Sequence, residues 1–124
     1  MENTDKTVWE QISQTLRGHN IDVYPPSTKV GECTKEYVVV KADGAAQIGS
    51  FSSQSVYYTF MLYVPRNAYN QLERFKRIVK DIVSVDLSPM LMPTGQETPD
   101  FYDDTVKAHM VSITYRNSVR NPQL

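Results

Sequence analysis

The fold of this chain is indicated first by residues 55–64, which read SVYYTFMLYV. Alternate residues of a β-strand point to opposite faces of a sheet, and here both alternating sets are largely apolar. That pattern is typical of a central strand with neighbours on each side and something packed on each face. Pro65 is expected to end the strand, because proline has no backbone N–H to donate to a neighbouring strand.

The residues after Pro65 change from a two-residue period to a helical one. Charged residues there alternate with apolar ones at spacings of three and four, as expected for a helix with one face on a core. We predict an amphipathic helix over 67–84, which is about 18 residues or about 27 Å long. Its apolar stripe consists of Tyr69, Leu72, Phe75, Val79, Ile82 and Val83.

The N-terminal part predicts a helix followed by two extended segments. Thr7 and Glu10 have the spacing of a capping box, and an apolar stripe follows them, so a helix is predicted over 5–17. Residues 21–24 form a short extended segment that stops at a proline pair. Residues 37–41 are mostly β-branched and predict a strand.

The C-terminal part predicts a weak strand at 88–93, a final strand at 105–115 and a flexible tail at 117–124. The resulting order is α-β-β-β-α-β-β. We therefore predict an α+β fold with a single mixed or antiparallel sheet of four to five strands and two packed helices. With 124 residues and no internal repeat, the chain is expected to form a single domain over 1–124.

Two segments, 43–54 and 94–104, are predicted to be long loops. The first contains glycines and small residues around Gln47 and Phe51, and the second is polar and acidic around Asp100. Loops of this length are usually functional, so both are candidate contact segments.

Composition sets limits on the class of protein. The net charge is −1 and the sequence pI is about 6.1, which gives no overall attraction to DNA or to an anionic membrane. The single cysteine, Cys33, fits a reducing compartment. The N-terminus lacks an apolar signal core, and no segment is long enough to span a bilayer. A protein made in the cytoplasm, with no membrane partner, is expected.

Catalytic and metal-binding patterns are not found in the sequence. No glycine-rich phosphate loop contains the required lysine, and Cys33, His19 and His109 are dispersed. A nucleophilic site of Cys33, His109 and an aspartate has no local signature, and His109 is more simply a structural histidine. The adjacent Asp103 and Asp104 are more simply turn formers than cation ligands. We expect a protein that is not an enzyme and has no cofactor or metal.

Charge is distributed unevenly along the chain. Residues 66–84 carry a net charge of +3, residues 85–104 carry −5, and residues 105–124 carry +3. One interpretation is ordinary solvated charge. The other is complementary charge on different sides of one subunit, which would suit head-to-tail association. On the second interpretation the candidate contact residues are Arg74, Arg77, Lys80, Asp100, Asp103, Asp104, Gln47 and Phe51.

Several segments occur in an order that resembles a known family. After the first helix come IDVYP at 21–25, EYVVVK at 36–41, YYTFMLYVP at 57–65, TPDFYDD at 98–104 and KAHMVSITY at 107–115. From the first helix to about Asn117, the chain resembles the tail-terminator and tail-completion proteins of long-tailed bacteriophages and prophages, particularly those of Gram-positive hosts.

This resemblance implies a non-enzymatic subunit of a hexameric ring that caps the completed tail tube and joins it to the head. The implied partners are further copies of the chain, the tail tube protein and the head–tail connector or head-closure protein. The implied location is the neck of the virion, after assembly in the cytoplasm of the bacterial host. The family has no catalytic residues to transfer to this sequence.

Three alternatives remain. A head-closure or connector-adaptor protein, or another minor neck protein, fits the size and the absence of catalytic patterns equally well. A small nucleic-acid-binding module could use the basic helix, although Glu73 and Asp81 interrupt its charge and no aromatic platform accompanies it. An enzyme ranks last.

Overall fold

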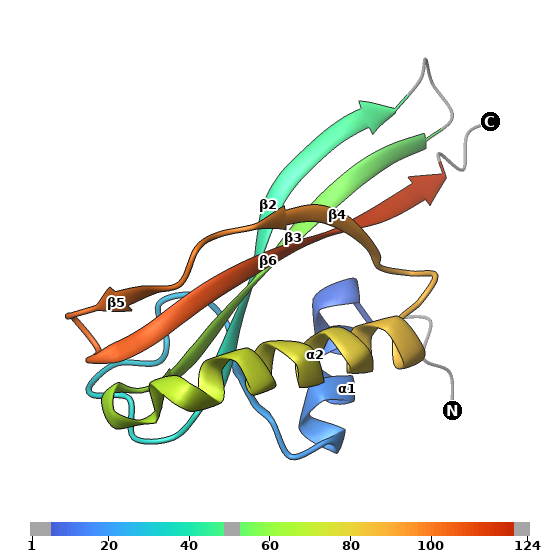
Figure 1. Ribbon diagram of the computed structural model, residues 1–124. Coiled ribbons are helices and arrows are strands. Elements are labelled where there is room, and N and C mark those ends of the chain that lie inside the picture. The colour runs from blue at the N-terminus through green and yellow to red at the C-terminus, as the bar shows by residue number, and fades with distance from the viewer. Residues whose placement is uncertain (1–5, 49–52, 121–124) are drawn as a thin grey trace.

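The computed structural model describes residues 6–48 and 53–120. In chain order its elements are α1 (Val8–Gly18), β1 (Asp22–Tyr24), β2 (Tyr37–Ile48), β3 (Ser53–Pro65), the 3₁₀ helix η1 (Arg66–Gln71), α2 (Leu72–Asp86), β4 (Met92–Glu97), β5 (Phe101–Asp103) and β6 (Ala108–Arg120). The fold is α+β, with two α-helices and a mixed sheet, as predicted (Figure 1). The sheet has six strands, more than the four to five expected.

Strand β3 lies at the centre of the sheet, which confirms the prediction from its sequence. The strands are ordered β1-β2-β3-β6-β4, and β5 pairs with another part of β6. β1 pairs with β2 in parallel, and all other pairs are antiparallel. β3 ends at Pro65, the residue expected to stop it.

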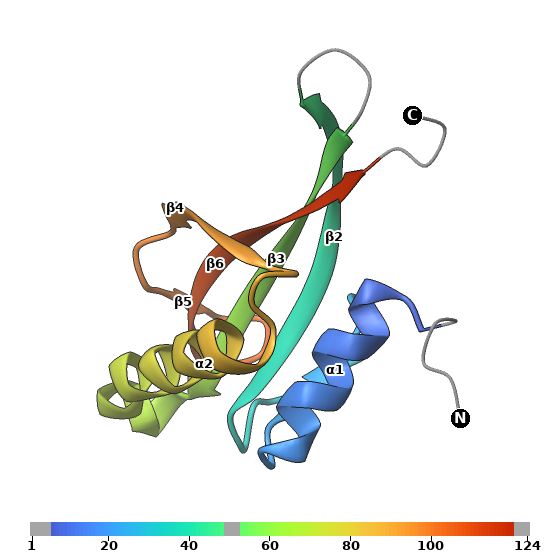
Figure 2. The ribbon, with the colours of Figure 1, turned by 90° about the vertical axis from the view of Figure 1, so that its right-hand side faces the viewer.

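Both helices pack on one face of the sheet (Figure 2). Helix α1 begins one residue after Thr7, whose side chain caps it, and the capping box with Glu10 is present as predicted. In the predicted helix over 67–84, the first turns are instead the 3₁₀ helix η1, and α2 follows it. Five members of the predicted stripe of the second helix are buried, but Tyr69 is 54% exposed, so its assignment to the buried stripe is wrong.

The main core lies between the helices and the sheet. Its fully buried side chains come from α1, α2, the sheet and Leu91 in the connection before β4, and the largest is Phe60 at 0% exposure. A smaller apolar cluster lies on the other face, where Cys33, Tyr37, Val39 and Ala108 pack together. Each face of the central strand is therefore partly covered, as its two apolar faces predicted.

The two predicted long loops are largely strand. Residues 43–48 continue β2, residues 53 and 54 begin β3, and Ile48 pairs with Ser53, so the first loop prediction is wrong. Within β2 a register shift leaves Asp43 as an extra residue between the partners of Tyr58 and Tyr57. The second predicted loop, 94–104, carries most of β4 and all of β5, because β6 supplies both with a pairing edge.

Two further boundaries differ from the sequence prediction. Residues 88–90 form a turn, and β4 begins at Met92, because Leu91 is drawn into the core and its N–H donates to the Leu87 carbonyl. The predicted strand at 88–93 is therefore displaced toward the C-terminus. The predicted tail at 117–124 is wrong for 117–120, which pair with β3 as part of β6. Residues 121–124 lie outside the described residues.

The sheet continues beyond the part that the helices cover. Residues 44–48, 53–57 and 116–120 of β2, β3 and β6 form a three-stranded extension, here called the blade, which projects away from both helices (Figures 1 and 2). We call the helices and the strands over them the body. The hairpin tip between β2 and β3, residues 49–52, lies outside the described residues.

Candidate interaction surfaces

Ion pairs join helix α2 to strand β4 within one molecule. Lys80 Nζ lies 2.6 Å from one carboxylate oxygen of Glu97, and Lys76 Nζ lies 3.2 Å from the other. These two ammonium groups hold the pKa of Glu97 below its usual value of 4.5, with Lys80 the larger cause. Part of the charge predicted to lie on different sides of the subunit is thus paired inside it, and Lys80, a predicted contact residue, takes part in that pairing.

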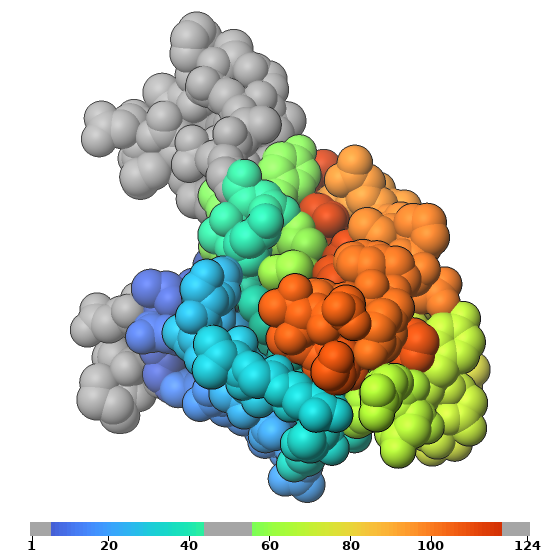
Figure 3. Space-filling view, turned by 90° about the vertical axis from the view of Figure 1, so that its left-hand side faces the viewer, coloured from blue at the N-terminus to red at the C-terminus, as the bar shows by residue number. Residues whose placement is uncertain are grey.

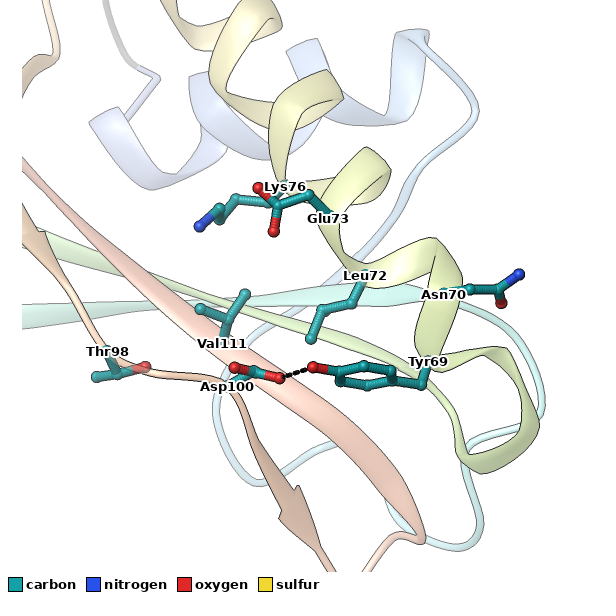
Figure 4. Close-up of a pocket in the computed structure, with 8 residues that line it drawn as sticks. All are labelled: Tyr69, Asn70, Leu72, Glu73, Lys76, Thr98, Asp100 and Val111. Atoms are coloured by element: carbon teal, nitrogen blue, oxygen red, sulfur yellow. Dashed lines mark hydrogen bonds between the residues drawn. The ribbon is translucent and has the colours of Figure 1, made fainter.

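A small pocket separates the start of α2 from the segment 98–100, which connects β4 and β5. It has a volume of about 170 Å³, and Leu72 and Val111 form its apolar part (Figure 4). At its mouth the Tyr69 hydroxyl donates a hydrogen bond to Asp100, which lowers the pKa of that carboxyl and raises the pKa of the tyrosine. Asp100, a predicted contact residue, therefore fastens the segment before β5 to the 3₁₀ helix η1.

Four rings surround β5, at the opposite end of the sheet from the blade: Tyr69, Tyr102 and His109 form one cluster, and Phe101 points to the other face of the strand. His109 makes edge-on contacts with Tyr69 and Tyr102, with ring centroids 4.7 and 5.2 Å apart. Phe101 and Tyr102 are 50% and 39% exposed. We call Tyr69, Phe101, Tyr102 and His109 the aromatic end; in Figure 3 the segment around β5 lies beside the first turns of η1 and α2. Exposed aromatic side chains of this kind are enriched at protein interfaces.

The outer face of α2 carries the predicted contact residues Arg74 and Arg77. Both are exposed, and no ion pair of either is found among the residues that the structure describes. Arg74 borders a groove of about 300 Å³ whose lining includes Phe75, Ile78 and the segment 34–36. Ile78 is 42% exposed. This face of α2 therefore joins positive charge to accessible apolar surface.

The other predicted contact residues lie apart from this face. The Asp103 carboxylate accepts the Thr105 N–H, and Asp104 lies 3.9 Å from Lys107, so both carboxylates organise the turn between β5 and β6. No group of three or more potential metal ligands is found within the described ranges. Gln47 pairs with Gln54 in the blade ladder, and Phe51 lies outside the described residues.

The imagined nucleophilic site is not assembled. Cys33 is 2% exposed and packs with Ala108, whereas the next residue of β6, His109, points to the opposite face of the sheet. The His109 ring nitrogen Nε2 lies 3.1 Å from the Arg66 carbonyl oxygen, which fits a structural role. Burial raises the pKa of the Cys33 thiol and so disfavours the reactive thiolate.

The most prominent surfaces of the structure were only partly visible in the sequence. The aromatic end was missed because Tyr69 fits the helical stripe and Phe101 and Tyr102 fell in a predicted loop. The unusual number of tyrosines, eight in 124 residues, was the available signal. The blade was missed because its glycines and alanines predict a loop.

Comparison of the chain with protein-family models and with curated proteins finds no match. Among the described residues, no helix is both long and apolar enough to cross a bilayer.

Proposed function

We propose that this chain is a non-enzymatic virion protein that forms a ring, caps the completed phage tail tube and provides the interface for joining the head. The observation that carries the proposal is the placement of two recognition surfaces at opposite ends of one sheet. The blade projects at one end and the aromatic end lies at the other (Figure 1). A ring subunit in a neck must meet a tube on one side and a connector on the other.

The order of segments that resembles tail-terminator proteins supports the same proposal. Those segments supply β1, the parts of β2, β3 and β6 that lie in the body, and β5 with most of the aromatic end, whereas the blade lies outside them except for Tyr57. The ring also needs lateral contacts between copies. The outer face of α2, with Arg74, Arg77 and Ile78, is a surface of suitable chemistry for such a contact.

The function is tested by removing the gene from a phage or prophage that carries it. We expect tails that are unfinished or longer than normal, together with heads that retain their DNA. Electron microscopy of particles then places the subunit at the end of the tail tube. Heads that leak DNA on tails of normal length would overturn the proposal in favour of a head-closure or connector-adaptor protein.

The use of α2 in lateral contacts is tested by charge reversal. The double variant Arg74→Glu, Arg77→Glu is expected to keep the fold, because both side chains are exposed, and to weaken assembly most at low salt. Native mass spectrometry over a salt series measures the assembled fraction. Arg74→Lys, Arg77→Lys is the matched control that keeps the charge. Equal assembly of all three proteins would contradict this role for α2.

A further inference from the structure

The blade has an unpaired strand edge on each side. β1 pairs with β2 only along Tyr37–Val39, so the outer edge of β2 from residue 41 to Ile48 has no strand partner within the described part of the chain. On the other side β4 pairs with β6 no further than Arg116, which leaves the outer edge of residues 117–120 unpaired among the described strands.

On each edge, a side chain donates a hydrogen bond to a main-chain carbonyl near the point at which strand pairing ends. The Trp9 indole N–H donates to the Val40 carbonyl oxygen at 2.7 Å, just beyond the last β1 partner. The Asn117 side-chain amide donates to the Met90 carbonyl oxygen at 2.8 Å, just before β4 begins. Main-chain protection by the body therefore stops at the base of the blade on both sides.

The two open edges lie at the same height in the sheet. Ala45 pairs with Val56, which pairs with Asn117, and Ile48 pairs with Ser53, which pairs with Arg120. Residues 45–48 of β2 and 117–120 of β6 are thus the two outer edges of the same four rows. Both strands run antiparallel to β3, so they run parallel to each other.

Unprotected edges of this kind are normally blunted. Natural sheets place lysine or proline on exposed edges, shorten them or cover them, because an open edge pairs with any other available strand. Lys41 and the extra residue Asp43 protect the start of this edge, but residues 44–48 read GAAQI and contain neither lysine nor proline. An edge of this length with no strand partner among residues 6–48 and 53–120 is best explained by a partner that completes it.

We infer that this partner is a second copy of the chain: the edge 117–120 of β6 in one copy pairs in parallel with the edge 45–48 of β2 in the next. The contact joins two different surfaces, so each added copy offers the same free edge again. The inference deepens the proposed ring and rests on it for closure. A ring of six copies would join about eighteen strands, a number at which closed barrels enclose an aqueous channel.

Disulfide cross-linking tests the pairing. In a Cys33→Ser background, Ser118→Cys is combined in turn with Ala45→Cys, Ala46→Cys and Gln47→Cys, which allows for a register shift of one residue. Neighbouring strands bring Cα atoms within disulfide range. The purified proteins are oxidised at millimolar concentration, where mass action favours association. We expect at least one double variant to give a ladder of covalent multimers, while every single variant stays monomeric.

Two outcomes of the cross-linking would overturn the inference. Covalent dimers from Ala46→Cys alone would show that β2 pairs with its own copy about a twofold axis. The absence of multimers from all three double variants would show that the edges do not meet. Hydrogen exchange provides a measurement that is independent of register: peptides covering 41–48 and 117–120 should both gain protection on assembly, and protection of only one of them would contradict the pairing.

The same experiments separate this inference from the proposed function. An open-ended ladder with no closed species by native mass spectrometry would keep the edge pairing and remove the ring. A closed ring without cross-links would keep the ring and remove the edge pairing.

Discussion

The body and the blade are continuous strands of one sheet with different physical support. In the body, helices α1 and α2 cover one face, and the residues beneath them include Phe60 and Leu62 at 0% exposure. In the blade the same strands β2, β3 and β6 continue with no helix beside them (Figures 1 and 2). The body is a domain core by composition and burial, whereas main-chain pairing joins the strands of the blade and Val56 and Asn117 pack its base against the body.

This difference indicates that the two parts of the sheet have different roles, the body in stability and the blade in assembly. Burial of apolar area supplies most of the free energy of folding, so the body is expected to determine stability. An extension with open edges contributes less to stability and offers main-chain donors and acceptors to another strand. We therefore expect substitutions in the body to change unfolding and changes in the blade to alter assembly.

The largest expected effect on stability comes from the centre of the body. Phe60→Ala removes a fully buried ring that contacts Tyr115 and is expected to cost about 3–5 kcal/mol of unfolding free energy. Equilibrium denaturation in urea measures the change. Val30→Ala, at a position 78% exposed, is the control and should stay within about 0.5 kcal/mol of the wild type. A loss below about 1 kcal/mol for Phe60→Ala would show that the core lies elsewhere.

A smaller effect is expected at the boundary between body and blade. Trp9→Phe keeps an aromatic ring but removes the N–H that satisfies the Val40 carbonyl, and it should cost about 1–2 kcal/mol. Thermal and denaturant unfolding of the variant measure the loss. If Trp9→Phe unfolds at the wild-type midpoint, the hydrogen bond from the indole to the Val40 carbonyl contributes nothing to stability.

The next effect depends on pH. Glu97 has a lowered pKa in the folded protein, so its stabilisation is present above its ordinary value of 4.5 and is lost as the pH falls through the lowered pKa. Because these side chains are partly exposed, Glu97→Gln should cost about 1 kcal/mol or less at pH 7. The difference from wild type should shrink toward zero in the most acidic buffers that keep the protein folded. A difference that is constant with pH would contradict the ion pairs.

The smallest effect on stability is expected from shortening the blade. Replacing residues 46–55 by Asn-Gly joins β2 and β3 through a two-residue hairpin turn and leaves the helix-covered strands unchanged. The monomer should unfold within about 1 kcal/mol of the wild type, as expected for changes away from a core. Assembly measured by native mass spectrometry should be abolished. Wild-type assembly of the shortened protein would contradict the assignment of assembly to the blade.

Sequence patterns predicted the parts of the fold in which local and tertiary preferences agree. The alternation at 55–64 gave the central strand, and the spacing of Thr7 and Glu10 gave the start of α1. The patterns failed to predict strands that form only because a distant strand pairs with them. MPTGQE in β4 and FYD in β5 show no alternation of their own, and β6 makes them strands.

The candidate contact residues show the same limit. Charge counted along the chain separated a basic helix from an acidic segment, but the fold places Lys76 and Lys80 against Glu97. Pairing over 17 to 21 residues of separation depends on topology, which charge counts do not contain. Arg74 and Arg77 remain candidates because they lie on the outer face of the same helix.

The extra residue at Asp43 has a consequence for how this sequence tolerates insertions and deletions. Below it, even-numbered residues of β2 pair with even-numbered residues of β3; above it, Ala45 pairs with Val56 and the parity changes. Removal of Asp43 alone would leave both sets of partners intact and merely straighten the strand. Removal of a residue further along β2 would instead force every pair between the cut and Asp43 to exchange faces. Length variation among related chains should therefore be concentrated around this position of the hairpin arm.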